Sequence, residues 1–135
     1  MIGAACAVLL GAVELLRGAY GVAILLFLIF VAFAFAVSPR AFPRSVTDAV
    51  SRERSAADGR AIVYWRPGCP FCLRLRASLG ADARRLHWVD IWSDPAGAAT
   101  VRAATGGDET VPTVVFEGEA HVNPLPARVR AMAGR

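Results

Sequence analysis

The sequence predicts an α/β domain with the element order β-α-β-α-β-β-α, preceded by an N-terminal transmembrane helical hairpin. Three observations support this prediction. Between Met1 and Val37, only Glu14 and Arg17 carry a charge. The rest of the chain alternates short apolar runs with polar stretches of helical length. The whole chain is 56% hydrophobic, with a mean hydropathy of +0.46, whereas soluble domains contain roughly 45–50% apolar residues.

Residues 19–37 are the stronger of two candidate transmembrane helices. They form a run of 19 residues without a charge. As a helix this run spans about 28 Å, close to the roughly 30 Å of a hydrocarbon core. The chain offers too little protein to cover it as a buried core helix. A cleaved signal peptide is disfavoured because no basic residues precede the apolar run, although Ala34-Phe35-Ala36 resembles a cleavage site.

Two interpretations stay open for residues 1–16. In one, they form the first helix of a hairpin that turns at residues 17–21. In the other, they lie on the membrane surface or continue into one long helix. The glycines of the turn favour the hairpin, and a continuous helix would place Glu14 and Arg17 near its middle, where charges are costly in a membrane.

Arg40 and Arg44 directly follow the apolar segment. By the positive-inside rule they place the C-terminal domain on the cytoplasmic side of a bacterial cell membrane. The chain uses Arg for every one of its 15 Lys or Arg positions, which is typical of a high-GC genome. The basic stretch also suits an anionic lipid surface.

The predicted boundaries therefore give three segments. A connector at residues 38–60 includes a short polar helix, which begins at a cap on Ser45 or Thr47 and ends at Gly59. The full set is a transmembrane segment at 1–37 with helices at 1–16 and 19–37, the basic connector at 38–60, and the α/β domain at 61–135.

Within the α/β domain, strands are expected where β-branched and aromatic residues gather, and helices where leucines or alanines recur before a glycine. The expected strands are residues 61–65, 86–91, 113–116 and 120–122. The expected helices are residues 72–79, 95–105 and 125–133.

Cys69 and Cys72 are the candidate catalytic residues. They follow the first strand and open the first helix, where unpaired amides and the helix dipole stabilise a thiolate at Cys69. Pro70 fits the first helical turn, where no amide donor is needed. Cys72 lies one turn further on, close enough to form a disulfide. We therefore expect Cys69 to attack and Cys72 to resolve the intermediate.

Other uses of the cysteine pair are disfavoured. A zinc site needs two more ligands, and His87 and His121 lie on different strands without the spacing of a ligand pair; no metal is expected. A structural disulfide across so short a loop adds little stability. Nucleic acid is excluded as a partner because the basic residues form no stripe interleaved with aromatics and match no known motif.

Residues 64–72, with the sequence YWRPGCPFC, resemble the active-site region of glutaredoxins. Residues 110–113, TVPT, resemble the Thr-Val-Pro segment that precedes the third strand of that family. The resemblance covers residues 61–133 and implies a thioredoxin/glutaredoxin-like fold with thiol–disulfide oxidoreductase activity. It also implies a cis peptide bond before Pro112, with the backbone of Val111 pairing with the substrate beside Cys69.

The resemblance and the position of the motif give a set of candidate substrate-binding residues around the cysteines. They are Trp65, Arg66, Pro70, Phe71, Val111 and Pro112.

Residues 121–124 depart from the glutathione-using members of the family. Those proteins carry a Gly-Gly-x-Asp stretch here, which holds the γ-glutamyl end of glutathione, whereas this chain has His121-Val122-Asn123-Pro124. With the high-GC character, this ending is more similar to the actinobacterial mycoredoxins. Mycothiol is therefore favoured over glutathione as the low-molecular-weight thiol co-substrate, and no tightly bound cofactor is expected.

Together these expectations describe a membrane-anchored thiol–disulfide oxidoreductase that reduces disulfide-containing proteins or mixed disulfides. Its partners would be those substrates and the lipid bilayer. Two alternatives stay open. One is a thiol-based binding or assembly module at the membrane with little turnover, and the other is an exported disulfide oxidase.

Overall fold

The computed structural model describes residues 2–16, 20–38, 40 and 42–134. The chain divides into two compact units, Met1–Ala41 and Phe42–Arg135.

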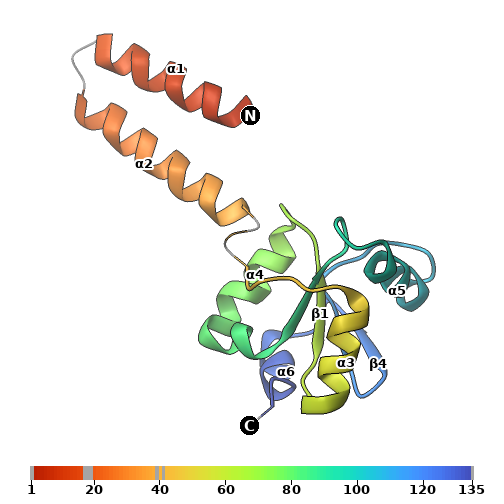
Figure 1. Ribbon diagram of the computed structural model, residues 1–135. Helices are drawn as coiled ribbons and strands as arrows, with labels where there is room; N and C mark the ends of the chain where they lie inside the picture. Colours follow the sequence, from red (N-terminus) through yellow and green to blue (C-terminus); the bar gives the residue numbers. More distant parts are fainter. Residues whose placement is uncertain (1, 17–19, 39, 41, 135) are drawn as a thin grey trace. The chain divides into compact units, whose positions relative to one another are not determined.

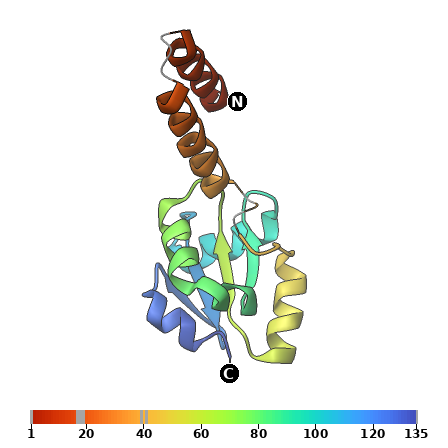
Figure 2. The same cartoon turned by 90° about the vertical axis from the view of Figure 1, so that its left-hand side faces the viewer.

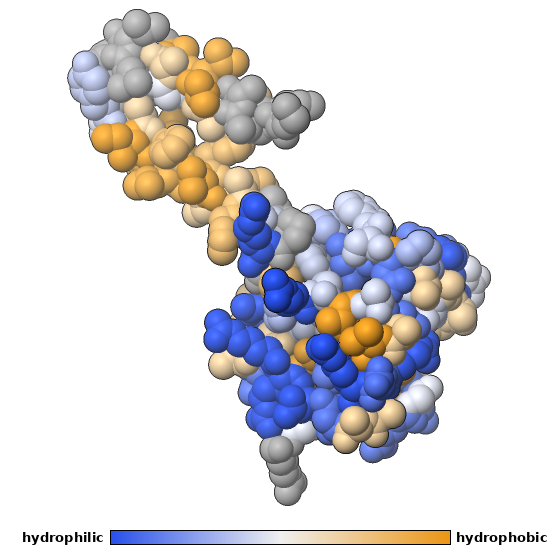
Figure 3. Space-filling model, in the orientation of Figure 1, coloured by the Kyte–Doolittle hydropathy of each residue, from blue (hydrophilic) through white to orange (hydrophobic). Residues whose placement is uncertain are grey.

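The first unit is a helical hairpin. Its helices are α1 (Ile2–Leu16) and α2 (Tyr20–Val37), which pack against each other (Figure 1). The expected hairpin is therefore confirmed over a continuous helix, although turn residues 17–19 lie outside the described residues. Both helices expose large apolar side chains, such as Leu9 and Phe27 at 66% and 53%. Figure 3 shows the hydrophobic character of the hairpin surface on this face.

The transmembrane part of the predicted fold class is wrong. Among the described helices, none combines the length and apolar character that crossing a membrane requires. α2, the longer of the two helices, holds 18 residues and rises about 27 Å, short of the roughly 30 Å of a hydrocarbon core. The predicted location, in a bacterial cell membrane with the redox domain facing the cytoplasm, is contradicted by the same finding. Arg40 and Arg44 can orient a chain only if a segment of it spans.

The second unit contains a four-stranded mixed sheet. Its strands are β1 (Ile62–Trp65), β2 (His87–Asp90), β3 (Thr113–Phe116) and β4 (Glu119–Val122), in the spatial order β2-β1-β3-β4. β1 runs parallel to β2 and antiparallel to β3, which forms a hairpin with β4. The predicted strands are confirmed to within one residue at each end.

Helices cover both faces of the sheet. α4 (Pro70–Leu79) and α6 (Pro126–Ala131) lie on one face, and α3 (Asp48–Asp58) and α5 (Pro95–Thr105) lie on the other (Figures 1 and 2). The predicted order β-α-β-α-β-β-α is confirmed for residues 61–133. A 3-10 helix, η2 (Gly80–Arg85), was not predicted, because so short a turn has no apolar period.

Residues 42–46, which we call the strap, pack against β1 and β2. Phe42 stacks on Trp65 with their ring centroids 3.7 Å apart. The indole N–H of Trp65 donates to the hydroxyl of Ser45 at 2.9 Å. The N–H of Val46 donates to the carbonyl of Trp88 at 2.9 Å. Residues 42–60 of the expected connector thus belong to the α/β unit, and Phe42 is part of its core.

α3 follows the strap and begins and ends as predicted. Thr47 is its N-cap, and its hydroxyl accepts the N–H of Val50. Gly59 ends the helix in the left-handed region, at φ 68°, where a residue without a Cβ is favoured.

Asp48 joins α3 to the sheet and to α5. It is 7% exposed, and its carboxylate accepts hydrogen bonds from Tyr64 Oη at 2.5 Å and Arg52 Nε at 2.7 Å, and from Thr100 Oγ1 at 3.3 Å. Burial on its own would raise the pKa of Asp48. The hydrogen bonds from Tyr64 and Arg52, with the charge of Arg52, outweigh burial and hold that pKa below its usual 3.8.

Replacing Asp48 with Ala should lower the free energy of unfolding by about 2–3 kcal/mol, because the buried hydroxyl of Tyr64 loses its acceptor. Urea denaturation of the full chain measures this, with Glu53→Gln on the exposed face of α3 as the control. Since the folded pKa of Asp48 lies below the unfolded one, its carboxylate stabilises the fold above about pH 4. The difference between wild type and Asp48→Ala should shrink as the pH falls through the folded pKa. A difference that grew on acidification would contradict this role.

Candidate active site

Cys69 is the N-cap residue of α4. Its backbone is extended, at φ −76° and ψ 116°, and its Sγ accepts the N–H of Cys72 at 3.3 Å. Pro70 occupies the first turn, where a missing N–H leaves no hydrogen bond unmade. The sulfur therefore sits where a cap oxygen usually sits, facing the positive end of the helix dipole. A negative charge on Cys69 Sγ is stabilised at this position.

The two thiols differ in their surroundings. Both are unpaired in this structure, and Cys69 is 6% exposed whereas Cys72 is fully buried. Burial raises the pKa of the Cys72 thiol strongly, and its hydrogen bond with Cys69 and the nearby charge of Cys69 raise it further. A hydrogen bond from the backbone of Arg66 acts in the opposite direction but is outweighed. Cys72 is therefore held as a protonated thiol beside Cys69.

The Val111–Pro112 peptide forms the wall facing Cys69. This bond is cis, which confirms the expectation. The carbonyl of Val111 lies 3.5 Å from Cys69 Sγ and accepts a hydrogen bond from that thiol. The carbonyl of Pro112 accepts the N–H of Asn123 at 2.8 Å. This hydrogen bond holds the segment after β4 close to the cis peptide. The exposed side chain of Asn123 therefore lies beside the site.

The other expected site residues are divided between surface and core. Phe71 is 56% exposed and lies next to Pro70, which is also exposed. Arg66 is partly exposed and lies in the loop between β1 and Cys69. Trp65, in contrast, is 1% exposed beneath Phe42 of the strap. Its ring belongs to the core.

Trp92 was missed in the sequence analysis. It follows β2 at the end of the sheet that carries the cysteines, and it is 63% exposed. The guanidinium carbon of Arg66 lies 5.9 Å from the centroid of its ring, a cation–π distance. The signal in the sequence was an aromatic residue placed just beyond the end of an alternating strand. Phe71, Arg66 and Trp92 give the rim of the site two exposed aromatic rings and a cation.

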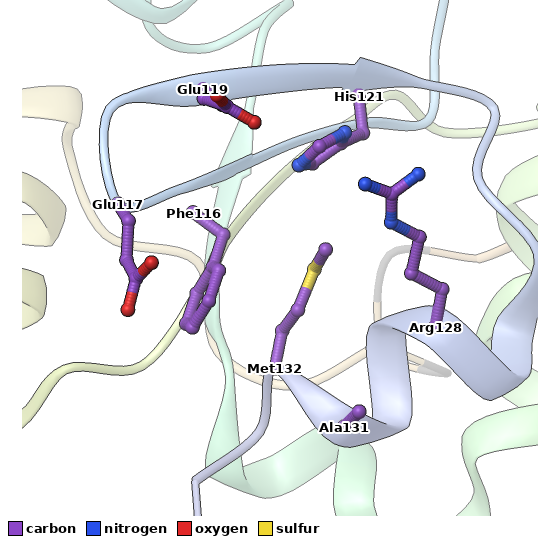
Figure 4. Close-up of a pocket in the computed structure, with 7 residues that line it drawn as sticks. All are labelled: Phe116, Glu117, Glu119, His121, Arg128, Ala131 and Met132. Carbon is purple, nitrogen blue, oxygen red and sulfur yellow. The ribbon is translucent and has the colours of Figure 1, made fainter.

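A cavity of about 420 Å³ lies elsewhere, between the β3–β4 hairpin and α6. Figure 4 shows His121 and Arg128 directed toward each other across it, with Glu119 on the same strand as His121. Phe116 and Glu117 line it at the turn end of the hairpin. β3 begins beside Pro112 and runs away from Cys69, so Phe116, Glu117 and Glu119 of this cavity lie toward the far end of the hairpin.

Comparison with known proteins gives a consistent result. A family model with the description Glutaredoxin matches residues 61–122, a range that contains both cysteines and the cis proline. Two proteins of Mycobacterium tuberculosis, from strains CDC 1551 / Oshkosh and H37Rv, each bear the name "Putative glutaredoxin". Each is 39% identical to this chain over 70 residues, covering 51% of this chain and 83% of the relative.

The two thiols should react at very different rates with iodoacetamide at about pH 7. The experiment uses a Cys6→Ser background, which removes the exposed cysteine of α1. Cys69 should be alkylated faster than Cys72 by about tenfold or more, because a buried thiol with a raised pKa presents little thiolate. Mass spectrometry of the digested protein gives both rates. The same reaction in denaturant is the control, where the rates should converge. Faster alkylation of Cys72 in the folded protein would reverse the assignment.

Proposed function

The chain belongs to the glutaredoxin family of thiol–disulfide oxidoreductases, and from this premise we propose that it reduces protein disulfides and mixed disulfides through Cys69 and Cys72. The observation that carries the proposal is the environment of Cys69 Sγ. It caps α4, accepts the N–H of Cys72, and lies 3.5 Å from the carbonyl of Val111. The attacking sulfur therefore lies beside both the resolving cysteine and the backbone segment that would contact the substrate.

In the first step, the thiolate of Cys69 attacks one sulfur of the substrate disulfide. A bond forms between Cys69 Sγ and that sulfur, the substrate S–S bond breaks, and the leaving sulfur departs as a thiolate that takes up a proton. The N–H of Cys72 and the amides of the first turn stabilise the negative charge on Cys69 before the attack. The product is a mixed disulfide between Cys69 and half of the substrate.

In the second step, Cys72 gives up its proton and its thiolate attacks Cys69 Sγ. The bond between Cys69 and the substrate sulfur breaks, the Cys69–Cys72 disulfide forms, and the departing substrate thiolate takes up a proton. The hydrogen bond with Cys69 and the nearby charge of Cys69 both raise the pKa of Cys72 in the reduced protein. A Cys69 in a mixed disulfide carries no charge, so this part of the barrier disappears once the first step is complete. Burial keeps Cys72 away from other disulfides until then.

The substrate is held beside Cys69 by groups that surround the exposed edge of the sulfur. The backbone of Val111, fixed by cis Pro112, pairs with the extended chain of the substrate. The exposed ring of Phe71, next to Pro70, supplies apolar contact. Arg66 attracts an anionic group. Trp65 acts indirectly by supporting the end of β1 from within the core.

The low-molecular-weight thiol that regenerates the reduced pair is mycothiol in preference to glutathione. The γ-glutamyl end of glutathione carries an ammonium and a carboxylate, which the Gly-Gly-x-Asp stretch of glutathione-using glutaredoxins recognises. In this chain Pro124 stands where that stretch has its Asp, so it supplies neither a negative charge nor a backbone donor. The N–H of Asn123 is already bonded to Pro112. The site therefore lacks partners for both charges.

Replacing Cys69 with Ser should abolish the reduction of every disulfide substrate, because the attacking thiolate is lost. Replacing Cys72 with Ser should spare the reduction of mixed disulfides with low-molecular-weight thiols but strongly impair that of protein disulfides, which need a resolving thiol. Stopped-flow or coupled assays on both substrate types separate the two roles. Cys6→Ser is the matched control and should behave like wild type. Activity that survived in Cys69→Ser and was lost in Cys72→Ser would exchange the roles.

The reduced chain should turn over a mycothiol mixed disulfide with a kcat/KM about tenfold higher than the corresponding glutathione mixed disulfide, the factor expected from one missing charged contact. Pro124→Asp supplies the missing carboxylate and a backbone donor, and should raise kcat/KM for the glutathione substrate while leaving that for mycothiol nearly unchanged. Equal values for both substrates in wild type would contradict the proposed preference and leave the roles of the cysteines intact.

A further inference from the structure

A second cavity, of about 440 Å³, is lined by positive charge. The strap, α3, the loop after α3, and the end of η2 with the start of β2 all contribute to it. Its basic residues come from these separate segments of the sequence and are Arg44, Arg54, Arg60, Arg84, Arg85 and His87.

Most of this charge has no counterion within the protein. Asp58 is the acid beside the cavity, and it accepts hydrogen bonds from His87 Nε2 at 3.0 Å and from the backbone N–H of Arg60 at 3.0 Å. Asp82, the acid of η2, is paired with Arg130 instead, at 3.2 Å. Across the described ranges of the chain, no carboxylate lies within ion-pair distance of Arg44, Arg54, Arg84 or Arg85.

Bringing four unpaired guanidinium groups to one concavity costs folding free energy through mutual repulsion. An anion bound between them removes this repulsion. The guanidinium group donates two parallel hydrogen bonds, a geometry that matches phosphate oxygens. The volume of the cavity falls in the range of small-molecule sites. Val46 and Leu86 add an apolar wall beside the arginines, so part of the ligand is uncharged.

We propose that this cavity binds a small organic anion that carries at least two phosphate groups, such as a nucleoside diphosphate. The site is distinct from the thiol site and does not depend on the function proposed for it. β2 runs parallel to β1, so His87, at the start of β2, lies at the end of the sheet opposite to Cys69. The ligand touches neither cysteine.

The burial of the aromatic side chain at this cavity favours a small ligand over a nucleic acid. Binding to single strands uses exposed aromatic rings on which bases stack. The aromatic residue of this cavity, Trp88, is 1% exposed, and its indole N–H is bonded to the carbonyl of Ala83 at 2.7 Å. The cavity thus offers an anion arginine side chains and no exposed aromatic ring.

The test is isothermal titration of the full chain with ADP at constant ionic strength, with pyrophosphate and adenosine as separate probes. We expect saturable 1:1 binding of ADP, competition by pyrophosphate, and no binding of adenosine. The double variant Arg84→Gln/Arg85→Gln should weaken ADP binding by about tenfold or more, and Arg54→Gln, from a different segment, should also weaken it.

The matched control is Arg74→Gln/Arg128→Gln, which removes the same charge outside the cavity and should change ADP affinity by less than about twofold. Amide NMR shifts on adding ADP to wild type should cluster at the strap, α3 and residues 84–88. An equal loss in both double variants, absence of saturable ADP binding, or adenosine binding as tightly as ADP would overturn the proposal. So would a mixed-sequence oligonucleotide that bound more tightly per phosphate than ADP, because the surface would then belong to a nucleic acid.

Discussion

Because every residue of β1 is buried, each polar group on its side chains needs a partner inside the protein. The partners come from the segment just before it. The hydroxyl of Tyr64 donates to Asp48, and the indole N–H of Trp65 donates to Ser45. These two bonds hold the strap and α3 against the sheet. They also fix the end of β1, from which the loop to Cys69 starts, so the geometry of the thiol site depends on residues that precede the predicted domain.

The sequence predicted most of the α/β unit because its signals are local. The first and third strands are dense in β-branched and aromatic residues, and the caps at Thr47 and Gly59 determine α3 almost to the residue. The position of Cys69 at the start of α4 and the cis bond at Pro112 followed from short motifs. Long-range contacts were not predicted: nothing local to Phe42 indicates that it stacks on Trp65, or that Trp65 is consequently removed from the substrate surface.

The apolar N-terminal segment shows a different limit of prediction. Hydropathy predicted a span over residues 19–37, whereas no described helix is long and apolar enough to cross a membrane. A profile of hydropathy measures how apolar a run of residues is and carries no information on where its helix begins and ends. Trp92 was overlooked because its signal, an aromatic residue just beyond a strand, is the same in sequence whether the side chain is exposed or buried.

The strap also changes which edges of the sheet are open to pairing with other molecules. β2 would be one of two open edges, but Val46 donates to the carbonyl of Trp88 along it, and β4 has a neighbouring strand on one side only. Edge-to-edge pairing of sheets polymerises only when each molecule has two free edges. The bridge at Trp88 shields β2 at that point from a strand of another molecule. β4 is the edge that stays open to such pairing.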